Sequence, residues 1–71
     1  MNREPETAPI RELLTQAAQR IPGDTPRLDA EVLLACVLDK PRSHLLAWPE
    51  KLLTAGQQAR FHALVERRVA G

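Results

Sequence analysis

Two histidines and one cysteine are the first candidates for nucleophilic or metal chemistry in this sequence. A reactive thiolate needs a nearby positive charge and access to solvent, but Cys36 lies in an apolar stretch without a basic neighbour. We therefore expect Cys36 to be a small buried packing residue. His44 and His62 belong to no metal-binding spacing, and His62 is expected to form an exposed helical pair with Glu66. The residue types thus predict no catalytic residue and no metal ligand.

Asp29 and Glu31 are close enough in sequence to suggest a general acid and a general base. Residues two positions apart on a helix point to different sides, so these two carboxylates cannot flank one substrate bond. We expect structural roles instead, with Asp29 near a helix start, where the dipole favours negative charge, and Glu31 paired with Arg27. The three glycines are dispersed, so no glycine-rich loop can hold a nucleotide phosphate and no cofactor-binding residue is predicted.

The length and the charge balance exclude several classes of protein. A chain of 71 residues has room for one small domain. Ten Lys and Arg residues against nine Asp and Glu residues leave a net charge of +1, which argues against DNA binding by phosphate neutralisation. The apolar stretch 32–38 is far shorter than the ~18 residues of a membrane span, and no secretory signal is visible. We expect a cytoplasmic monomer that binds neither nucleic acid nor membrane.

The hydrophobic pattern predicts an all-α fold, a small bundle of four to five short helices. Apolar residues recur at helical spacing over residues 10–21, with Thr7 as the expected N-cap. A second helix is expected over residues 26–38, after the cap residue Thr25. Its second half is apolar on every face, which is typical of a helix buried against several neighbours. A buried strand over residues 32–38 is the competing interpretation, but the alanine and leucine content favours a helix.

Two further helices complete the predicted bundle. The segment between Pro41 and Pro49 has room for about two turns. A last long helix begins after Thr54, which forms a capping box with Gln57. Its expected inner stripe consists of Phe61, Leu64, Val65 and Val69.

The most distinctive segment is residues 26–38, PRLDAEVLLACVL. It resembles the N-terminal domain of the PrmC/HemK family, whose members methylate the glutamine of the Gly-Gly-Gln motif in bacterial peptide chain release factors. The segments IRELL over 10–14, RSHLLAWPE over 42–50 and ERRVAG over 66–71 resemble the same domain in the same order. Four matching segments in order support the resemblance more strongly than any one of them.

The resemblance implies a helical domain that precedes a Rossmann-like catalytic domain, which uses S-adenosylmethionine as cofactor. The family's Gly-rich cofactor loop and its Asn-Pro-Pro-Tyr motif do not occur in this sequence. We therefore expect a disordered N-terminus over residues 1–6, one helical domain over 7–71, and a chain cut after Gly71, ahead of the catalytic methyltransferase domain. The parent would be the enzyme, whereas this chain alone would carry no catalytic or cofactor-binding residue.

The resemblance also implies that the domain helps to recognise the release factor and to orient it toward the parent's catalytic domain, the second expected partner. Arg27, Arg42, His44 and Trp48 are the predicted partner surface, because a short segment between prolines presents polar and aromatic side chains. The competing interpretation is that Trp48 packs onto the bundle and the arginines are merely solvated. The alternative functions are an independent protein–protein interaction module or regulator, and a DNA-binding helical domain.

Overall fold

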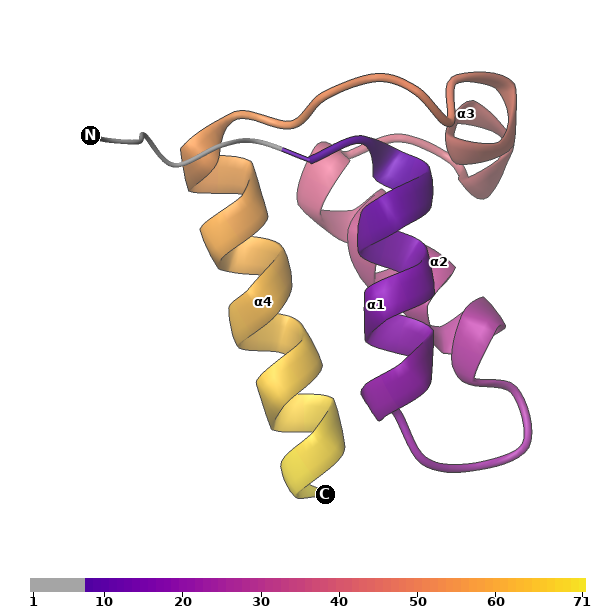
Figure 1. Ribbon diagram of the computed structural model, residues 1–71, viewed down its shortest axis with the longest axis vertical. Coiled ribbons are helices and arrows are strands. Elements are labelled where there is room, and N and C mark those ends of the chain that lie inside the picture. Colours follow the sequence, from indigo (N-terminus) through magenta and orange to yellow (C-terminus); the bar gives the residue numbers. More distant parts are fainter. Residues whose placement is uncertain (1–7) are drawn as a thin grey trace.

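Residues 8–71, the part of the chain that the computed structural model describes, form four α-helices (Figure 1). They are α1 (Ile10–Arg20), α2 (Pro26–Leu38), α3 (Arg42–Ala47) and α4 (Ala55–Ala70). This architecture confirms the predicted all-α bundle, and the strand considered for residues 32–38 is excluded because they lie within α2. None of these helices is both long enough and apolar enough to cross a membrane.

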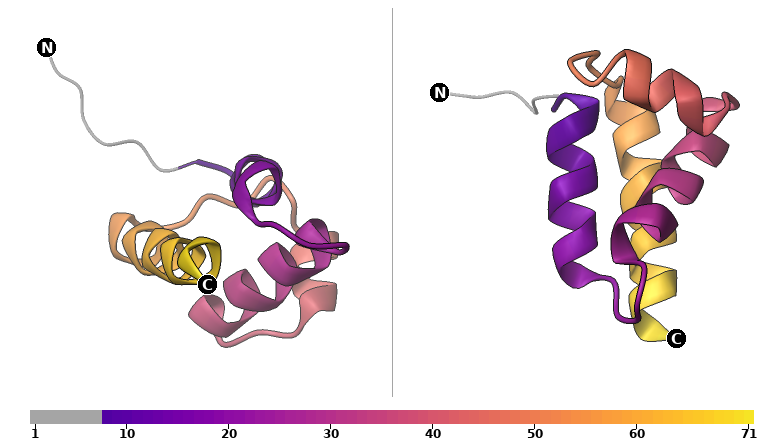
Figure 2. Two further views of the ribbon diagram at one scale, coloured as in Figure 1. Left: turned by 90° about the horizontal axis from the view of Figure 1, so that it is seen from below. Right: turned by 90° about the vertical axis from the view of Figure 1, so that its right-hand side faces the viewer.

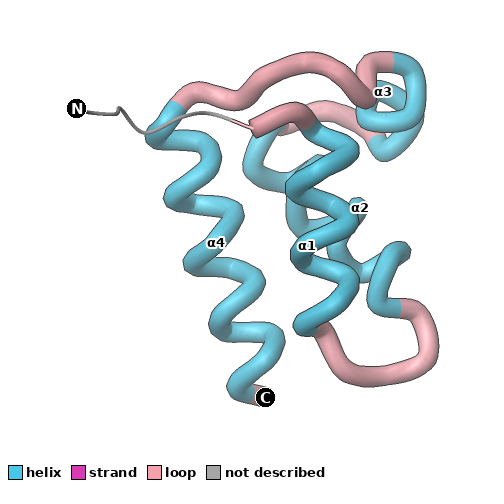
Figure 3. The backbone as a smooth tube through the Cα atoms, viewed as in Figure 1, coloured by secondary structure: helices cyan, strands magenta, loops and turns pink. Residues whose placement is uncertain are grey.

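The three longer helices surround the core, and the short α3 closes one end of the bundle (Figure 2). α1 and α4 lie side by side along the molecule, with α2 behind α1 in the view of Figure 1. The chain after α3 crosses the end of the bundle as an irregular segment to reach the start of α4 (Figure 3). α3 and this connector therefore present one continuous surface at a single end of the molecule.

The core consists of aliphatic side chains from all four helices and a single aromatic ring. Its largest fully buried side chains are Ile10, Leu13, Leu14, Leu34, Leu45 and Phe61. Phe61 and Val65 are buried on α4, while Leu64 and Val69 beside them are half-buried. The predicted inner stripe of the last helix is thereby confirmed.

The start of α1 differs from the sequence-based expectation. Pro9 occupies the N-cap position and the helix begins at Ile10, while Thr7 and the residues expected to be disordered lie outside the described residues. The N–H groups of Ile10 and Arg11 bond to the carbonyls of Lys51 and Pro49, at 3.0 and 2.9 Å. Because the connector satisfies donors that an N-cap side chain normally satisfies, α1 begins without a side-chain cap.

α2 begins and ends as predicted but is less covered than predicted. Pro26 is its first residue after Thr25, and Asp39 ends it in the left-handed conformation, with φ 57°, which aspartate tolerates better than most residues. Its inward face is buried, but Val32 is 51% exposed and Cys36 is also exposed. The expectation of an all-round buried helix is therefore wrong, because the neighbouring helices cover only one side of α2.

The capping box at the start of α4 is present as predicted. Thr54 Oγ1 accepts a hydrogen bond from the Gln57 N–H at 3.1 Å, and Gln57 Oε1 accepts one from the Thr54 N–H at 3.0 Å. These two bonds satisfy two N–H groups that would otherwise lack partners at the helix start. The register of α4 relative to the connector is thereby fixed.

Thr54→Ala removes the acceptor at the N-cap and should lower the free energy of unfolding by about 1 kcal/mol. Thr15→Ala is the matched control, because Thr15 is exposed in the interior of α1 and its hydroxyl only bonds back to the Arg11 carbonyl. Urea unfolding followed by circular dichroism measures both. Equal stability of the Thr54→Ala variant and the parent would show that the box does not hold α4 in solution.

Candidate functional site

A hydrogen-bonded group of charged side chains is built around Glu31, which is only 6% exposed. Its Oε1 accepts hydrogen bonds from Arg42 Nη2 at 2.8 Å and from Arg42 Nε at 3.1 Å, and its Oε2 accepts one from Arg27 Nε at 3.3 Å. The predicted pairing of Arg27 with Glu31 is confirmed. The contact with Arg42 was not predicted, because it joins α2 to α3 across a loop. We call these three residues the arginine cluster.

Two guanidinium groups share one carboxylate in the arginine cluster, which leaves one positive charge in excess. The side chains of Arg27 and Arg42 are about half exposed, at 50% and 48%, whereas Glu31 is buried. A guanidinium has five N–H donors in a fixed plane, so each arginine retains donors that Glu31 does not use. The cluster is therefore suited to accepting a carboxylate from a partner.

Asp29 faces away from Glu31, as the helical spacing predicts. Its Oδ2 accepts a hydrogen bond from Arg68 Nη2 at 3.0 Å, which ties the start of α2 to the end of α4. The two carboxylates thus have separate arginine partners on different elements. Each carboxylate therefore has an ion-pair role within the fold.

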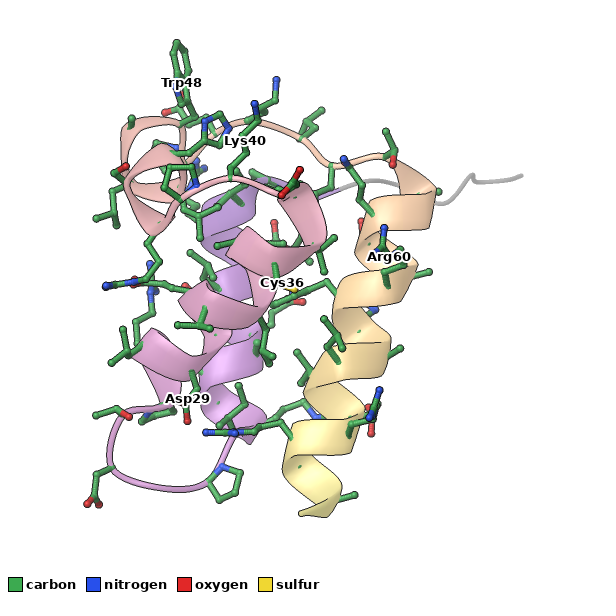
Figure 4. The ribbon with its side chains drawn as sticks, turned by 180° about the vertical axis from the view of Figure 1, so that it is seen from behind. Asp29, Cys36, Lys40, Trp48 and Arg60 are labelled. Carbon is green, nitrogen blue, oxygen red and sulfur yellow. The ribbon has the colours of Figure 1, made fainter. Side chains whose placement is uncertain are left out.

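Two large apolar side chains are exposed at the end of α3. Trp48 is 59% exposed and Leu46 60%, and Figure 4 shows the Trp48 ring pointing away from the bundle. The interpretation that Trp48 packs onto the bundle is therefore wrong. Leu46 is four residues after Arg42, which places both on one side of α3. Arg42 of the arginine cluster and the exposed Leu46 are therefore on the same side of α3, while Trp48 is the C-cap residue of the helix.

His44 belongs to a different part of the same end. It is half-buried and lines a shallow hollow with Lys40, Lys51 and Leu52. The structure thus brings Arg27 and Arg42 together and exposes Trp48, but it places His44 beside two lysines. Lys40 and Lys51 were missed by sequence reasoning, because they are isolated in the chain and meet only where the connector returns past α3.

The remaining candidate residues have structural or surface positions. Cys36 is exposed on α2, so the expectation of a buried thiol is wrong. Its side of α2 is apolar, but no other helix of residues 8–71 covers that side. The described residues contain no group of three or more His, Cys, Asp and Glu side chains placed to hold a metal ion.

The carboxylate of Glu66 pairs with Arg20 on α1 rather than with His62 on its own helix. The hydrogen bond and the charge of Arg20 hold the pKa of Glu66 below its ordinary value of 4.5, and the charge of His62 adds a smaller lowering effect. The same contact raises the pKa of Arg20. The pair therefore links α1 to α4 whenever Glu66 is ionised.

A lowered carboxylate pKa in the folded state makes stability depend on acid pH. The contribution of the Arg20–Glu66 pair should be complete above the ordinary glutamate pKa and lost as the pH falls through the lowered pKa of Glu66. We expect Glu66→Gln to reduce the difference between the thermal unfolding midpoints at pH 7 and pH 3. Glu50→Gln is the control, because Glu50 is exposed. An equal reduction in both variants would contradict the role of the pair.

Comparison with known proteins adds the family relationship. The sequence model of the PrmC N-terminal domain matches residues 12–71. The chain is 57% identical over 49 residues to a release factor glutamine methyltransferase of Aliivibrio fischeri, a match that covers 69% of this chain and 17% of the relative. It is 49% identical over 57 residues to one of Vibrio cholerae, covering 80% of this chain and 20% of the relative.

A third relative, a release factor glutamine methyltransferase of Coxiella burnetii, is 55% identical over 47 residues, which are 66% of this chain and 17% of the relative. This chain thus spans about a fifth of the length of the curated relatives that it matches. No solved structure matches it significantly. Because the domain model covers nearly all of the described residues, the chain belongs to the PrmC N-terminal domain family.

Proposed function

We propose that this chain is the substrate-recognition part of a release factor glutamine methyltransferase. The parent enzyme would transfer a methyl group from S-adenosylmethionine to the glutamine of the Gly-Gly-Gln motif of a release factor. The observation that carries the proposal is that α3 presents Arg42, which the buried Glu31 holds in place, together with the exposed Leu46 and Trp48 at the end of the helix. This surface has the features of a protein-binding site and no reactive group.

A separate recognition surface solves a physical problem for such an enzyme. A single glutamine in a short loop gives an active site few contacts by which to distinguish one protein from another. A second surface on the same polypeptide makes the second contact intramolecular, which raises overall affinity by about 10²–10⁴-fold when the geometry fits. The enzyme then selects the folded substrate rather than any accessible glutamine.

In this proposal, the described surface is matched by a partner of complementary chemistry. Arg27 and Arg42 are pre-oriented by a buried carboxylate, so little side-chain freedom is lost when they bind. Tryptophan and arginine are the residues most enriched among the contacts that dominate protein interfaces. The matching surface on the release factor would therefore carry carboxylates beside an apolar group. In this proposal the chain holds neither the cofactor nor the reacting glutamine.

The test is the affinity of this chain for a purified release factor, measured by isothermal titration calorimetry. Arg27→Glu and Arg42→Glu should each weaken binding at least tenfold and reduce its salt dependence, since rim and charge-pair contacts are sensitive to ionic strength. Trp48→Ala should weaken binding to a similar extent without changing the salt dependence.

Two further variants make this test interpretable. Arg42→Glu places a second carboxylate beside Glu31, so Arg42→Gln is the variant that removes the charge without that repulsion. Arg11→Glu is the matched control, because Arg11 is exposed on α1 and outside the arginine cluster. Unchanged affinity and salt dependence in Arg27→Glu and Arg42→Gln, both verified to be folded, would refute the proposed surface.

A further inference from the structure

One face of α2 is apolar and uncovered. Leu28 and Val32 are 40% and 51% exposed, and Cys36 is also exposed. These residues follow one another at intervals of four, so they form one line along the helix, which we call the α2 stripe. Seen from behind in Figure 4, Cys36 lies on α2 with α1 beyond it, and no helix of residues 8–71 lies in front. The stripe thus lacks the cover that a helix apolar on every face normally has.

The C-terminal end of the chain leads to the same side of the molecule. Arg68 in the last turn of α4 bonds to Asp29 at the start of α2. Gly71 borders a shallow hollow together with Leu33 and Leu64, and Leu33 directly follows Val32 of the stripe. A polypeptide that continues from Gly71 would leave the bundle next to the α2 stripe.

The relatives contain such a polypeptide. The match covers 17% and 20% of two of them, so about four fifths of each relative lies outside it, and the family model identifies this chain with the N-terminal domain. In these relatives the rest of the polypeptide is tethered to the domain, and it is therefore present at a high effective concentration near the position of the stripe. Under those conditions, even a weak apolar interaction would keep this polypeptide bound to the stripe.

The charges around the α2 stripe indicate what kind of surface would cover it. Arg60 and Arg67 lie exposed on α4, and Lys40 lies just beyond the end of α2. None of these three takes part in an ion pair among the described residues. Of the carboxylates nearby, Asp29 is already neutralised by Arg68, and the exposed Asp39 lines the same hollow as Val32, Cys36 and Lys40. The rim is therefore mostly basic, and a complementary partner would be apolar at its centre with carboxylates around it.

We propose that the α2 stripe is the intramolecular interface on which the remaining part of the methyltransferase polypeptide packs, through an apolar surface edged by carboxylates. The proposal rests on the proposed function, since it assumes the same parent enzyme. It assigns two surfaces of the molecule different tasks. The end with α3 and Trp48 contacts the substrate protein, while the face of α2 holds the domain to its own enzyme.

Cys36 provides the test, because it is the only cysteine of the chain and lies within the stripe. This chain is placed in the Aliivibrio fischeri methyltransferase instead of the corresponding segment. The rate at which Cys36 reacts with a maleimide is then measured by mass spectrometry of its peptide, in this fusion and in the 71-residue chain. We expect the rate to be at least tenfold lower in the fusion, and equal rates would overturn the proposal.

Two variants serve as controls for this measurement. Gln19→Cys in a Cys36→Ser background places the thiol on an exposed position of α1, where the rate should be the same in both proteins. Val32→Glu adds a charge to the stripe and should restore fast labelling of Cys36 in the fusion without lowering the thermal midpoint of the 71-residue chain. A Val32→Glu fusion that remains protected would contradict the proposal.

A second copy of the chain is the alternative occupant of the stripe. In that case labelling of the 71-residue chain would slow as its own concentration rises, and this result would also overturn the proposal. The readout needs no release factor, so a failure of the proposed substrate surface would leave the protection of Cys36 unchanged. The two proposals can therefore fail separately.

Discussion

Replacing Leu34 by alanine should lower the free energy of unfolding by about 2–5 kcal/mol, the usual cost of removing a buried leucine side chain. Leu34 is 0% exposed and lies in the middle of α2, which packs against each of the other three helices. A domain of this size has a net stability of only a few kcal/mol. The Leu34→Ala variant is therefore expected to be largely unfolded at 37 °C.

Leu33→Ala is the matched control, because Leu33 is the same residue type in the adjacent position but is only half-buried. Its loss removes less apolar surface from the core, and we expect a cost of about 1 kcal/mol. Urea unfolding at low temperature, followed by circular dichroism, compares the two variants with the parent. Equal costs for both positions would show that the inward face of α2 is assigned wrongly.

Removing the carboxylate of Glu31 is the second large effect. Glu31→Ala should lower the free energy of unfolding by about 1.5–3 kcal/mol, the usual range for hydrogen bonds that involve a charged group. Breaking a fully buried ion pair costs about 3–5 kcal/mol, but Arg27 and Arg42 are half exposed and recover water when the carboxylate is lost. The expected loss is therefore below that range.

The Glu31→Ala variant should also bind the release factor more weakly, although Glu31 itself is buried. Arg27 and Arg42 would no longer be held in one orientation, so binding would have to order them. Asp29→Ala is the control, because it removes one arginine contact on the other side of α2 and should leave the affinity unchanged. Equal losses of affinity in both variants would show that general destabilisation, rather than the arginine cluster, is responsible.

Sequence reasoning succeeded where interactions are local. The capping box joins Thr54 to Gln57 three residues later, and the pair of Arg27 and Glu31 spans four residues. Both follow from the repeat of the helix alone. The end of α2 after residue 38 was likewise predicted, because turn chemistry depends on neighbours in the chain.

Sequence reasoning failed where the answer depends on how the helices are placed. Arg42 reaches Glu31 from the next helix, and a one-dimensional pattern does not specify that distance. Cys36 was expected to be buried because its surroundings are apolar, but the pattern does not specify how many neighbouring helices cover α2. The exposure of Trp48 depended in the same way on the path of the connector after α3.

The central claim is that this domain recognises the substrate and takes no part in the chemical step. It is tested most directly by methylation kinetics of the Aliivibrio fischeri enzyme with this chain as its N-terminal domain, compared with the same enzyme without any such domain. We expect loss of the domain to raise KM for a folded release factor at least tenfold and to leave kcat/KM for a short Gly-Gly-Gln peptide unchanged. Equal KM values for the release factor, or an equal loss of activity on the peptide, would contradict the account.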